Sequence, residues 1–553
     1  MDKSRQPGPE NGGEQPLRPD PEKTGATRVV RLHVHRPGDR VIRTHRDRAY
    51  HLRRILGVPA LFSVGYGDVG SSIFYALGLV AVVALGATPL VLGIAGIFFV
   101  FTALTYAEGT SMFPEAGGSS SFARHGFNDV VAFIAGWALM FSYIITVSIS
   151  AFTVPHYLAY FWPVLKQPHA AIFFSMALVL FLMVVNVIGI RESGRLNLSL
   201  IGLDLITEIL MVVTALVLFF NAKVVWHRMV ENWPSTSNIV FGVAIATVAF
   251  TGIESISQLA GEAKDPQRRV PKALGLMMFT VLGLFTAIAI SAFSVMSPVD
   301  LAGKWEEDAV AGVANSIYNG ISPTAWAAGL SNDLSAQTVL AFFANLFRSL
   351  FPILIALMGS AILIVATNAG LIGISRTSFS LAENHSLPPL FAKVHSKFKT
   401  PYMSIIVFAV IAMVIIAQGL IVPDIFTVLG GLYAFGSMAS FSLAHASILA
   451  LRAKQPDRAR PFKLRLSVKI KGRDIPLTAV FGLLFTTGVW IVIMVVQPYS
   501  RYFGLAWMGV GIVLYVLFRR SKGYSLTHHV QTHSRPASTV QRPADSLRPP
   551  EPK

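Results

Sequence analysis

Two polar, glycine-containing runs lie inside apolar segments of this chain: Gly65-Tyr66-Gly67-Asp68-Val69-Gly70-Ser71-Ser72 and Phe250-Thr251-Gly252-Ile253-Glu254-Ser255. Each segment is long enough to cross the ~30 Å hydrocarbon core of a membrane, and each run places a carboxylate among its glycines. Irregular backbone at that depth is tolerated only where it lines a cavity or is buried in protein, because unsatisfied amides are costly in lipid. We therefore predict two broken helices that face a shared internal site.

The composition of the 553 residues is that of a membrane protein. Hydrophobic residues make up 53% and charged residues 14%, and the mean hydropathy is +0.57, whereas soluble domains carry roughly 25% charged residues. The 46 Lys and Arg exceed the 29 Asp and Glu, for a net charge of +17. This surplus fits membrane topology and anionic lipid headgroups better than nucleic acid. The chain has no cysteine, which excludes disulfides and thiol chemistry.

Apolar stretches of about 20 residues, each sufficient for one crossing, recur about twelve times. The expected spans are 55–84, 88–108, 126–153, 169–190, 196–221, 238–261, 271–296, 338–372, 400–418, 422–450, 475–497 and 501–519. We predict an all-α polytopic membrane protein, with room for short interfacial helices in 297–337.

Residues 1–50 and 520–553 are polar, basic and rich in proline, and the first has no apolar core of a signal peptide. We predict two disordered tails around a core of ten spans (51–450) and a loop with spans eleven and twelve (451–519). Basic residues concentrate in the loops on one side, as cytoplasmic loops do. Both termini are therefore expected in the cytoplasm, with the chain crossing the cell membrane many times.

Spans one and six would be the first helices of two successive five-helix units. Glycine-interrupted spans at matching positions indicate a 5+5 inverted repeat, typical of transporters whose site lies at the membrane midplane. A half-helix N-terminus suits a carboxylate, and exposed carbonyls suit an ammonium group or an alkali cation. We expect the amides from Gly70 to Ser72 to bind the carboxylate and the carbonyls from Phe250 to Gly252 the amine. The alternative is that the glycines only permit close helix packing.

Four patches of sequence resemble the amino acid, polyamine and organocation (APC) permease superfamily, whose members share the leucine-transporter fold. They are Gly70-Ser71-Ser72-Ile73-Phe74; Tyr106-Ala107-Glu108 through Gly118 to Arg124; Phe250 through Glu254 with Gly261 to Pro271; and Ser375-Arg376 with Ala382-Glu383-Asn384 and Leu387-Pro388. Ser72 stands where the family has a glycine. The resemblance covers about residues 55–450, implies this fold with broken helices one and six, and is specific for the superfamily but not for the substrate.

The first run also resembles the proton-coupled potassium uptake permeases of the same fold. These permeases carry an Asp and a Tyr for the cation in their first helix, as Asp68 and Tyr75 do here. Ser142 lies near the position where these permeases would be expected to have a carboxylate, which weakens the interpretation as a potassium permease. Conversely, Asp68 is unusual for a neutral amino acid permease.

Acidic residues inside the membrane are costly and are candidates for function. We expect Asp68 to bind a cation or ammonium group or to cycle a proton, with helix capping as the alternative. Asp204 and Glu208 lie four residues apart, hence on one face of span five, and are expected to exchange the coupling proton unless they only form interhelical hydrogen bonds. The resemblance implies that Asp204 stands where related proton-coupled permeases have a Lys. Glu254 is expected to tie the unwound strand of span six to its neighbours.

The complete expected site combines substrate-binding and coupling residues. Substrate binding is assigned to Tyr66, Gly67, Asp68, Gly70, Ser71, Ser72, Tyr75, Tyr143, Phe250, Thr251 and Gly252, and coupling to Asp204, Glu208 and Glu254. Tyr433 is a further candidate for closing the cavity. Ser360, Thr367 and Asn368 are weaker candidates for sodium, because Ser and Thr on membrane helices often bond their own backbone.

The chain lacks an HExxH helix, a Walker loop and a nucleophile elbow, so we expect no catalytic residue, no metal and no cofactor besides the coupling ion. We predict a secondary active transporter that imports amino acids or related amine-bearing solutes by alternating access, with protons rather than sodium. The expected partners are the solute (an amino acid or a cation) and membrane lipids, not nucleic acid, and the oligomeric state is left open. Proton-coupled potassium uptake is the alternative, and a non-transporting membrane sensor is a third, weaker one.

Overall fold

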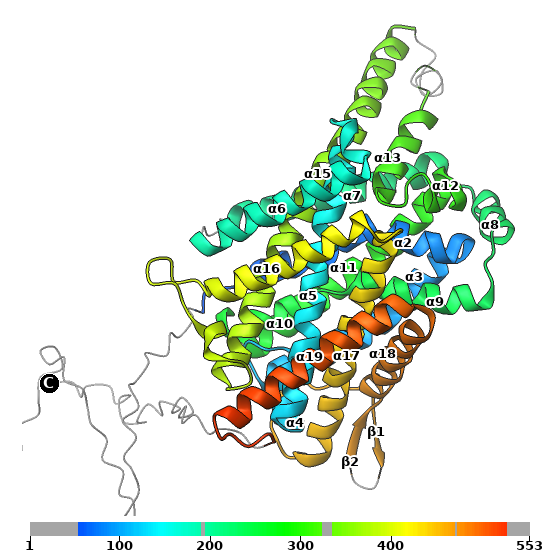
Figure 1. The fold of residues 1–553 in the computed structure, drawn as a ribbon. Coiled ribbons are helices and arrows are strands. Elements are labelled where there is room, and N and C mark those ends of the chain that lie inside the picture. The colour runs from blue at the N-terminus through cyan, green and yellow to red at the C-terminus, as the bar shows by residue number, and fades with distance from the viewer. Residues whose placement is uncertain (1–53, 190–193, 323, 325–333, 471–472, 528–553) are drawn as a thin grey trace, which may run out of the picture. The chain divides into compact units, whose positions relative to one another are not determined.

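The computed structural model describes residues 54–189, 194–322, 324, 334–470 and 473–527 (Figure 1). Residues 1–50 and most of 520–553, predicted to be tails, lie outside these ranges. Within them, eleven helices are long and apolar enough to cross a membrane. The prediction of a polytopic helical membrane protein is confirmed, while the 5+5 repeat stays a prediction.

The first long helical stretch, Val58–Met112, contains two of the predicted spans. Its 55 residues would extend about 80 Å at 1.5 Å per residue, more than twice the hydrocarbon thickness. It consists of α1 (Val58–Val69), η1 (Gly70–Ser72), α2 (Ile73–Ala84), η2 (Leu85–Ala87) and α3 (Thr88–Met112). The chain turns at Leu85, which has a positive φ of 41°, so this stretch supplies spans one and two.

The remaining long helices follow the predicted spans in order. They are α5 (Asp129–Leu158), α6 (Pro168–Ile188), α7 (Gly194–Phe219), α9 to α10 (Thr236–Ala246 and Glu254–Gln258, joined through η4, Thr247–Phe250), α11 (Pro266–Val295), α15 (Leu334–Glu383), α16 (Tyr402–Ala417), α17 (Ile425–Lys454), α18 (Leu477–Val496) and α19 (Pro498–Ser521). Short helices lie in the loops: α4 (Ser119–Gly126), η3 (Pro163–Lys166), α8 (Ala222–Glu231), η5 (Ala260–Glu262), α12 (Pro298–Ala302), α13 (Ala309–Gly320), η6 (Pro389–Ala392) and η7 (Gln418–Leu420). Helices α12 and α13 confirm short helices between 297 and 337.

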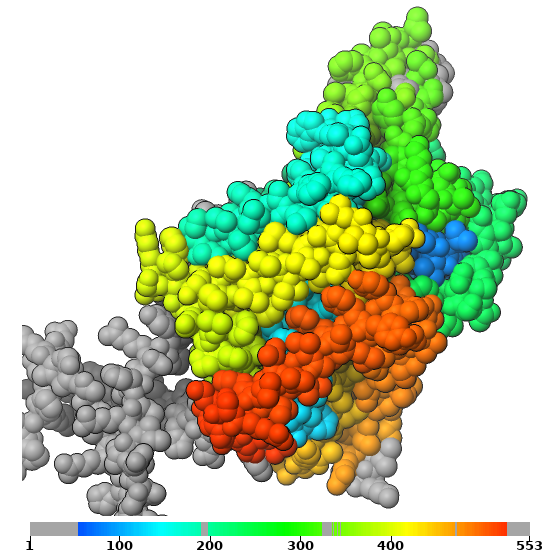
Figure 2. Space-filling view, in the orientation of Figure 1, coloured from blue at the N-terminus to red at the C-terminus, as the bar shows by residue number. Residues whose placement is uncertain are grey.

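Helix α5 passes through the centre of the bundle, and α6, α16 and α19 lie on the surface shown in Figure 2. In the most apolar window of α5, 83% of the residues are buried, against 28% for α6 and 22% for α19. The outer helices expose large apolar side chains such as Phe181 and Leu517, as a lipid-facing surface requires. The interior around α5 is therefore where polar groups can be enclosed by protein.

A short antiparallel pair of strands, β1 (Ser467–Ile470) and β2 (Arg473–Pro476), was not predicted. Arg452 of α17 holds this pair to the bundle, with one guanidinium nitrogen 2.7 Å from Asp474 and two others 2.6 and 2.8 Å from the oxygens of Glu108 on α3. Because the three side chains are far apart in sequence, hydropathy does not reveal this network.

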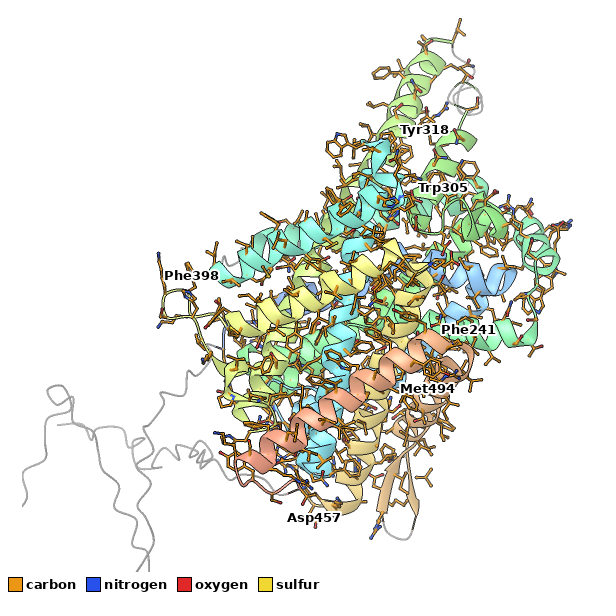
Figure 3. All side chains as sticks on the ribbon, in the orientation of Figure 1. Phe241, Trp305, Tyr318, Phe398, Asp457 and Met494 are labelled. Carbon is orange, nitrogen blue, oxygen red and sulfur yellow. The ribbon has the colours of Figure 1, made fainter. Side chains whose placement is uncertain are left out.

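The loops gather at two ends of the bundle. Trp305 and Tyr318 lie at one end and Asp457 at the other (Figure 3). We call these ends the Trp305 side and the Asp457 side. The positive-inside rule predicts that the Asp457 side is cytoplasmic.

Candidate functional site

Span six is broken where the sequence predicts it. After η4, Thr251 is extended (φ −80°, ψ 155°) and Gly252 has a φ of 109°, a conformation that favours glycine. The free amide of Gly252 donates a hydrogen bond of 3.1 Å to Oε2 of Glu254. Glu254 therefore satisfies the backbone of its own break.

Span one is not broken, which corrects the prediction of an unwound segment at Gly70 to Ser72. Gly70, Ser72 and Ile73 keep right-handed helical angles, and the helix only tightens into a 3-10 turn. The Ser71 hydroxyl donates to the carbonyl oxygen of Asp68 at 2.8 Å. Because the backbone from Gly70 to Ile73 stays helical, its amides do not form the predicted binding site for a solute carboxylate in this conformation.

The glycines of span one instead permit close packing, the alternative interpretation of the run. A Cβ atom on Gly65 would lie 2.5 Å from the side chain of Ile256, and one on Gly67 3.2 Å from Val365. A Cβ on Gly70 would lie 2.5 Å from the ring of Tyr66. Glycine therefore permits a positive φ angle in span six, whereas in span one it leaves room for neighbouring side chains to pack against the helix.

Asp68 connects the two spans. Ser255, one helical turn beyond the break, donates a hydrogen bond to Oδ2 of Asp68. A Cβ on Gly252 would lie 2.9 Å from the Asp68 carboxyl carbon, so only glycine leaves room for this approach. Asp68 is fully buried, and its Oδ1 has no hydrogen-bond partner among the described residues.

Tyrosines from three other elements surround this carboxylate. Tyr75 of α2, Tyr143 of α5 and Tyr433 of α17 are buried and interact electrostatically with Asp68. The Tyr75 hydroxyl is 2.8 Å from that of Ser72. The hydroxyls of Tyr143 and Tyr433 form no hydrogen bond within the described part of the chain. The centre therefore combines two buried acids, Asp68 and Glu254, with hydroxyl groups that can accept from or donate to a bound group.

Phe250 and Thr251 contribute differently from what was expected. The Phe250 ring packs between Phe99 and Phe285, at centroid distances of 5.3 and 5.6 Å, and the Thr251 hydroxyl donates to the Val248 carbonyl at 2.8 Å. Both side chains are occupied, so these residues can offer only their backbone carbonyls to a solute.

Asp204 and Glu208 form a second acidic centre, and Tyr66 belongs to it rather than to the Asp68 centre. The Tyr66 hydroxyl donates a hydrogen bond of 2.6 Å to Oε2 of Glu208. Asp204 and Glu208 are 1% and 0% exposed, and both Asp204 oxygens lack a partner among the described residues. The charged group that acts on Asp204 is Glu208, so this pair has no compensating cation in the part of the chain that is described.

A cavity of about 90 Å³ lies beside the Asp68 centre, since Ser255, which bonds Asp68, is one of its lining residues. Its polar lining includes Tyr143, Ser255, Gln258, Asn368 and Arg376. Arg376 also forms an ion pair of 2.9 Å with Glu262.

Of these polar residues, sequence reasoning gave no site role to Ser255, Gln258 and Arg376. Ser255 and Gln258 could have been found, because they lie three and six residues beyond Gly252 on the helix that follows the break.

The weaker sodium candidates have other partners. Ser360 and Thr367 donate to carbonyls of their own helix at 2.6 and 2.8 Å, and Asn368 accepts from Asn186 at 2.6 Å. Among the described residues, no group of three or more His, Asp or Glu is placed to hold a metal ion.

Known proteins match nearly the whole bundle. Residues 56–518 match the amino acid permease family. The branched-chain amino acid permease BcaP of Bacillus subtilis is 26% identical over 499 residues, 85% of this chain and 94% of BcaP. The methylthioribose transporter of the same organism is 24% identical over 503 residues, covering 85% and 94%.

A third relative has yet another solute in its name. The low-affinity putrescine importer PlaP of Escherichia coli is 22% identical over 449 residues, 80% of this chain and 88% of PlaP. The relatives thus differ in the solutes they are named for, while their alignments cover most of the chain. Because the family match includes both glycine-containing runs and extends into the last span, this chain belongs to the amino acid permease family.

Proposed function

We propose that the protein is a secondary active transporter that imports amino acids or related amine-bearing solutes together with protons. The observation that carries this proposal is the contact of the buried Asp68 carboxylate with the break in span six, through Ser255 and against Gly252. A carboxylate beside irregular backbone provides what an ammonium group needs, namely a counter-charge and carbonyl acceptors. BcaP and PlaP, named for an amino acid and a diamine, are in keeping with such a solute.

The amine of the solute would lie at Oδ1 of Asp68, near the backbone carbonyls of Phe250 and Thr251. Tyr75 and Tyr143 would contact the rest of the solute. Binding of a solute carboxylate by the amides of Gly70 to Ser72 requires the 3-10 turn to open, because the turn is helical in this conformation. A solute without a carboxylate would need no such change.

Proton coupling would depend on Asp204 and Glu208. Two buried acids on adjacent helical turns, without a cation beside them, favour a state in which one of them carries a proton. The Tyr66 hydroxyl connects Glu208 to span one, and the Tyr66 ring packs on Gly70. A change of charge at the pair can therefore act on the segment of span one that follows Asp68.

Alternating access would rock spans one, two, six and seven against spans three, four, eight and nine. Backbone hydrogen bonds between Leu56, just before α1, and Glu262 and Lys264, after span six, support the joint movement of spans one and six. The ion pair between Arg376 and Glu262 would then have to break when the Asp457 side opens.

Uptake into proteoliposomes under an imposed inward proton gradient tests this function. A labelled amino acid mixture, putrescine and rubidium are offered in parallel, with empty liposomes and a proton uncoupler as controls. Accumulation of an amine-bearing solute that the uncoupler abolishes is expected. Asp204→Asn should remove the pH dependence of uptake, and full pH-dependent uptake by this variant would rule out the proposed coupling role.

Proton-coupled potassium uptake is the second candidate. The unpartnered Oδ1 of Asp68 and the hydroxyl of Tyr75 could also coordinate an alkali cation. Accumulation of rubidium without any amine would replace the amine assignment and leave the fold unaffected.

A further inference from the structure

A six-residue loop covers span one on the Trp305 side of the membrane. We call residues 303–308, between α12 and α13, the Trp305 loop. A Cβ on Gly78 of α2 would lie 1.8 Å from the carbonyl oxygen of Glu306, so the backbone of the loop rests directly on α2. Gly78 lies three residues beyond Tyr75, on the same helix. The loop therefore covers α2 one helical turn beyond Tyr75.

A buried histidine holds this loop. His156, near the end of α5, is 4% exposed. Its Nε2 lies 2.9 Å from Oε2 of Glu307, and its Nδ1 lies 3.0 Å from the carbonyl oxygen of Phe152 in the preceding turn of α5. Both ring nitrogens thus face oxygen atoms.

These contacts determine how many protons the pair holds. A neutral imidazole has one N–H donor and one acceptor nitrogen, and only the imidazolium donates from both nitrogens. A carbonyl oxygen cannot donate, and an ionised carboxylate cannot donate either. The observed geometry is satisfied only if His156 is an imidazolium or Glu307 is protonated. Either state contains one proton more than a neutral imidazole beside a carboxylate.

We propose that His156 and Glu307 together bind one proton on the Trp305 side, and that this proton holds the Trp305 loop against α2. Loss of the proton leaves a single N–H on His156, so one ring nitrogen turns a lone pair either to the Glu307 carboxylate or to the Phe152 carbonyl, and one of the two contacts becomes repulsive. The loop is then released from α5, and the route to the Asp68 centre opens.

Other charged groups around the pair affect its response to pH. Lys166 of η3 forms an ion pair of 3.1 Å with Asp308 and lies over the Trp305 ring, 4.8 Å from its centroid. Glu306 faces Glu307 and Asp424, the residue before α17. Lys304 also lies over the Trp305 ring, at 5.2 Å. The loop thus carries three adjacent acids, of which two have a basic partner.

The pKa values of two of these acids are shifted in opposite directions. Burial raises the pKa of Glu306 to about 7, and the charges of Glu307 and Asp424 add to this. Burial opposes ionisation of Glu307, but the hydrogen bond and charge of His156 outweigh burial and lower its pKa. At acidic pH Glu306 is neutral, so repulsion among the acids of the loop is smallest. As pH rises through about 7, Glu306 gains a charge, and its repulsion from Glu307 and Asp424 weakens the hold on the loop.

This inference rests on the proposed import of solute with protons. If the Trp305 side faces an acidic exterior, protons that bind at the loop favour closure of that side. An inward proton gradient would then favour the step that transfers the solute toward the Asp457 side.

A single introduced cysteine reports on the loop, because the chain has no cysteine of its own. Ser150, fully buried on α5 beside Tyr75, is replaced by Cys and labelled in intact cells with a membrane-impermeant thiosulfonate. Val299→Cys, at an exposed position of α12, is the control. Its labelling rate corrects for the pH dependence of the reagent and shows whether the reagent reaches the Trp305 side. If Val299→Cys is not labelled in intact cells, the labelling is carried out on inside-out vesicles, which expose the Trp305 side to the reagent. The corrected rate at Ser150→Cys is expected to be about tenfold higher at pH 8 than at pH 6, as linkage to about one proton implies.

Two substitutions of Glu307 separate the proton from the contact. Glu307→Gln can donate its amide N–H to Nε2 of a neutral His156, so labelling should stay slow and lose its pH dependence. Glu307→Ala removes the contact, so labelling should be fast at both pH values. The matched control is Glu231→Gln in the exposed His227–Glu231 pair of α8, whose nitrogen–oxygen distance is 3.2 Å; it should behave like the parent. Size-exclusion profiles identify any variant that does not fold.

The proposal is overturned if the corrected labelling of Ser150→Cys is equal at pH 6 and pH 8, or if Glu307→Gln keeps the parent's pH dependence. Because labelling needs no solute, these outcomes differ from a failure of the proposed function. A protein that transports no solute but shows the expected labelling would retain the proton site and lose only the transport assignment.

Discussion

Spans one and six both contain a glycine-rich polar run, yet only span six is broken. In span six, Thr251 is extended and Gly252 has a φ of 109°. In span one, the residues from Gly70 to Ile73 stay right-handed helical and only tighten into a 3-10 turn. Glycine content alone therefore does not identify a broken helix, since glycine also serves the close packing of helices.

The difference has a physical cause in the partners that each segment finds. The Gly252 amide is satisfied by Glu254, so the chain can leave the helix without an unpaired donor. In span one, the Ser71 hydroxyl adds a bond to a backbone that is still helical. The moving part of the site is thus expected to be span one, because its helix can still open, whereas span six is already unwound.

The largest effect is expected from the group that joins the two spans. Asp68→Asn keeps an oxygen for Ser255 but removes the charge, so amine uptake should fall at least about tenfold, equivalent to about 1.4 kcal/mol. Initial uptake rates in proteoliposomes measure this, with thermal unfolding as a control for folding. Uptake at the parent rate would show that the spans cooperate without the charge of Asp68.

Gly252→Ala and Gly70→Ala test the comparison directly. At Gly252 the substitution forces a left-handed alanine, at a cost of about 1–3 kcal/mol, and places its Cβ 2.9 Å from the Asp68 carboxyl carbon. At Gly70 the backbone accepts alanine, and the Tyr66 ring is the group that must shift. Uptake and melting temperature should both fall strongly for Gly252→Ala and much less for Gly70→Ala. The reverse order would mean that span one, not span six, depends on glycine conformation.

Tyr66→Phe should have an intermediate effect. It removes the hydrogen bond to Glu208, which is 2.6 Å long and contributes about 1–3 kcal/mol as a bond to a charged or shared-proton group. The ring that packs on Gly70 is retained. We expect a several-fold lower uptake rate and a shifted pH profile with little change in amine affinity, measured as KM over a range of pH. An unchanged pH profile would separate span one from the Asp204–Glu208 pair.

Ser71→Ala is expected to have the smallest effect. The Ser71 hydroxyl only supplements helical hydrogen bonds through its bond to the Asp68 carbonyl, and such bonds to a preceding turn slightly destabilise or bend helices. Melting temperature and uptake should stay close to those of the parent. A loss comparable to that of Gly252→Ala would indicate that the 3-10 turn itself is essential.

The candidate site was only partly predictable. Asp68 meets Gly252 at the break in span six, while Tyr66 contacts Glu208 and the Phe250 ring packs into an aromatic cluster. Ser255 and Asp68 are 187 positions apart, and Tyr66 and Glu208 are 142 apart. No spacing rule relates residues so distant, because their contact depends on how the helices pack.

The sequence by itself determined the class of protein, the succession of spans and the break in span six. These properties follow from sums over about 20 neighbouring residues and from the local preferences of glycine. Only the tertiary structure decided that span one stays helical, that Asp68 meets Ser255, and that the Trp305 loop is tied to His156. Each of these depends on which distant group lies within about 3 Å of a given polar atom, and helix packing sets that distance.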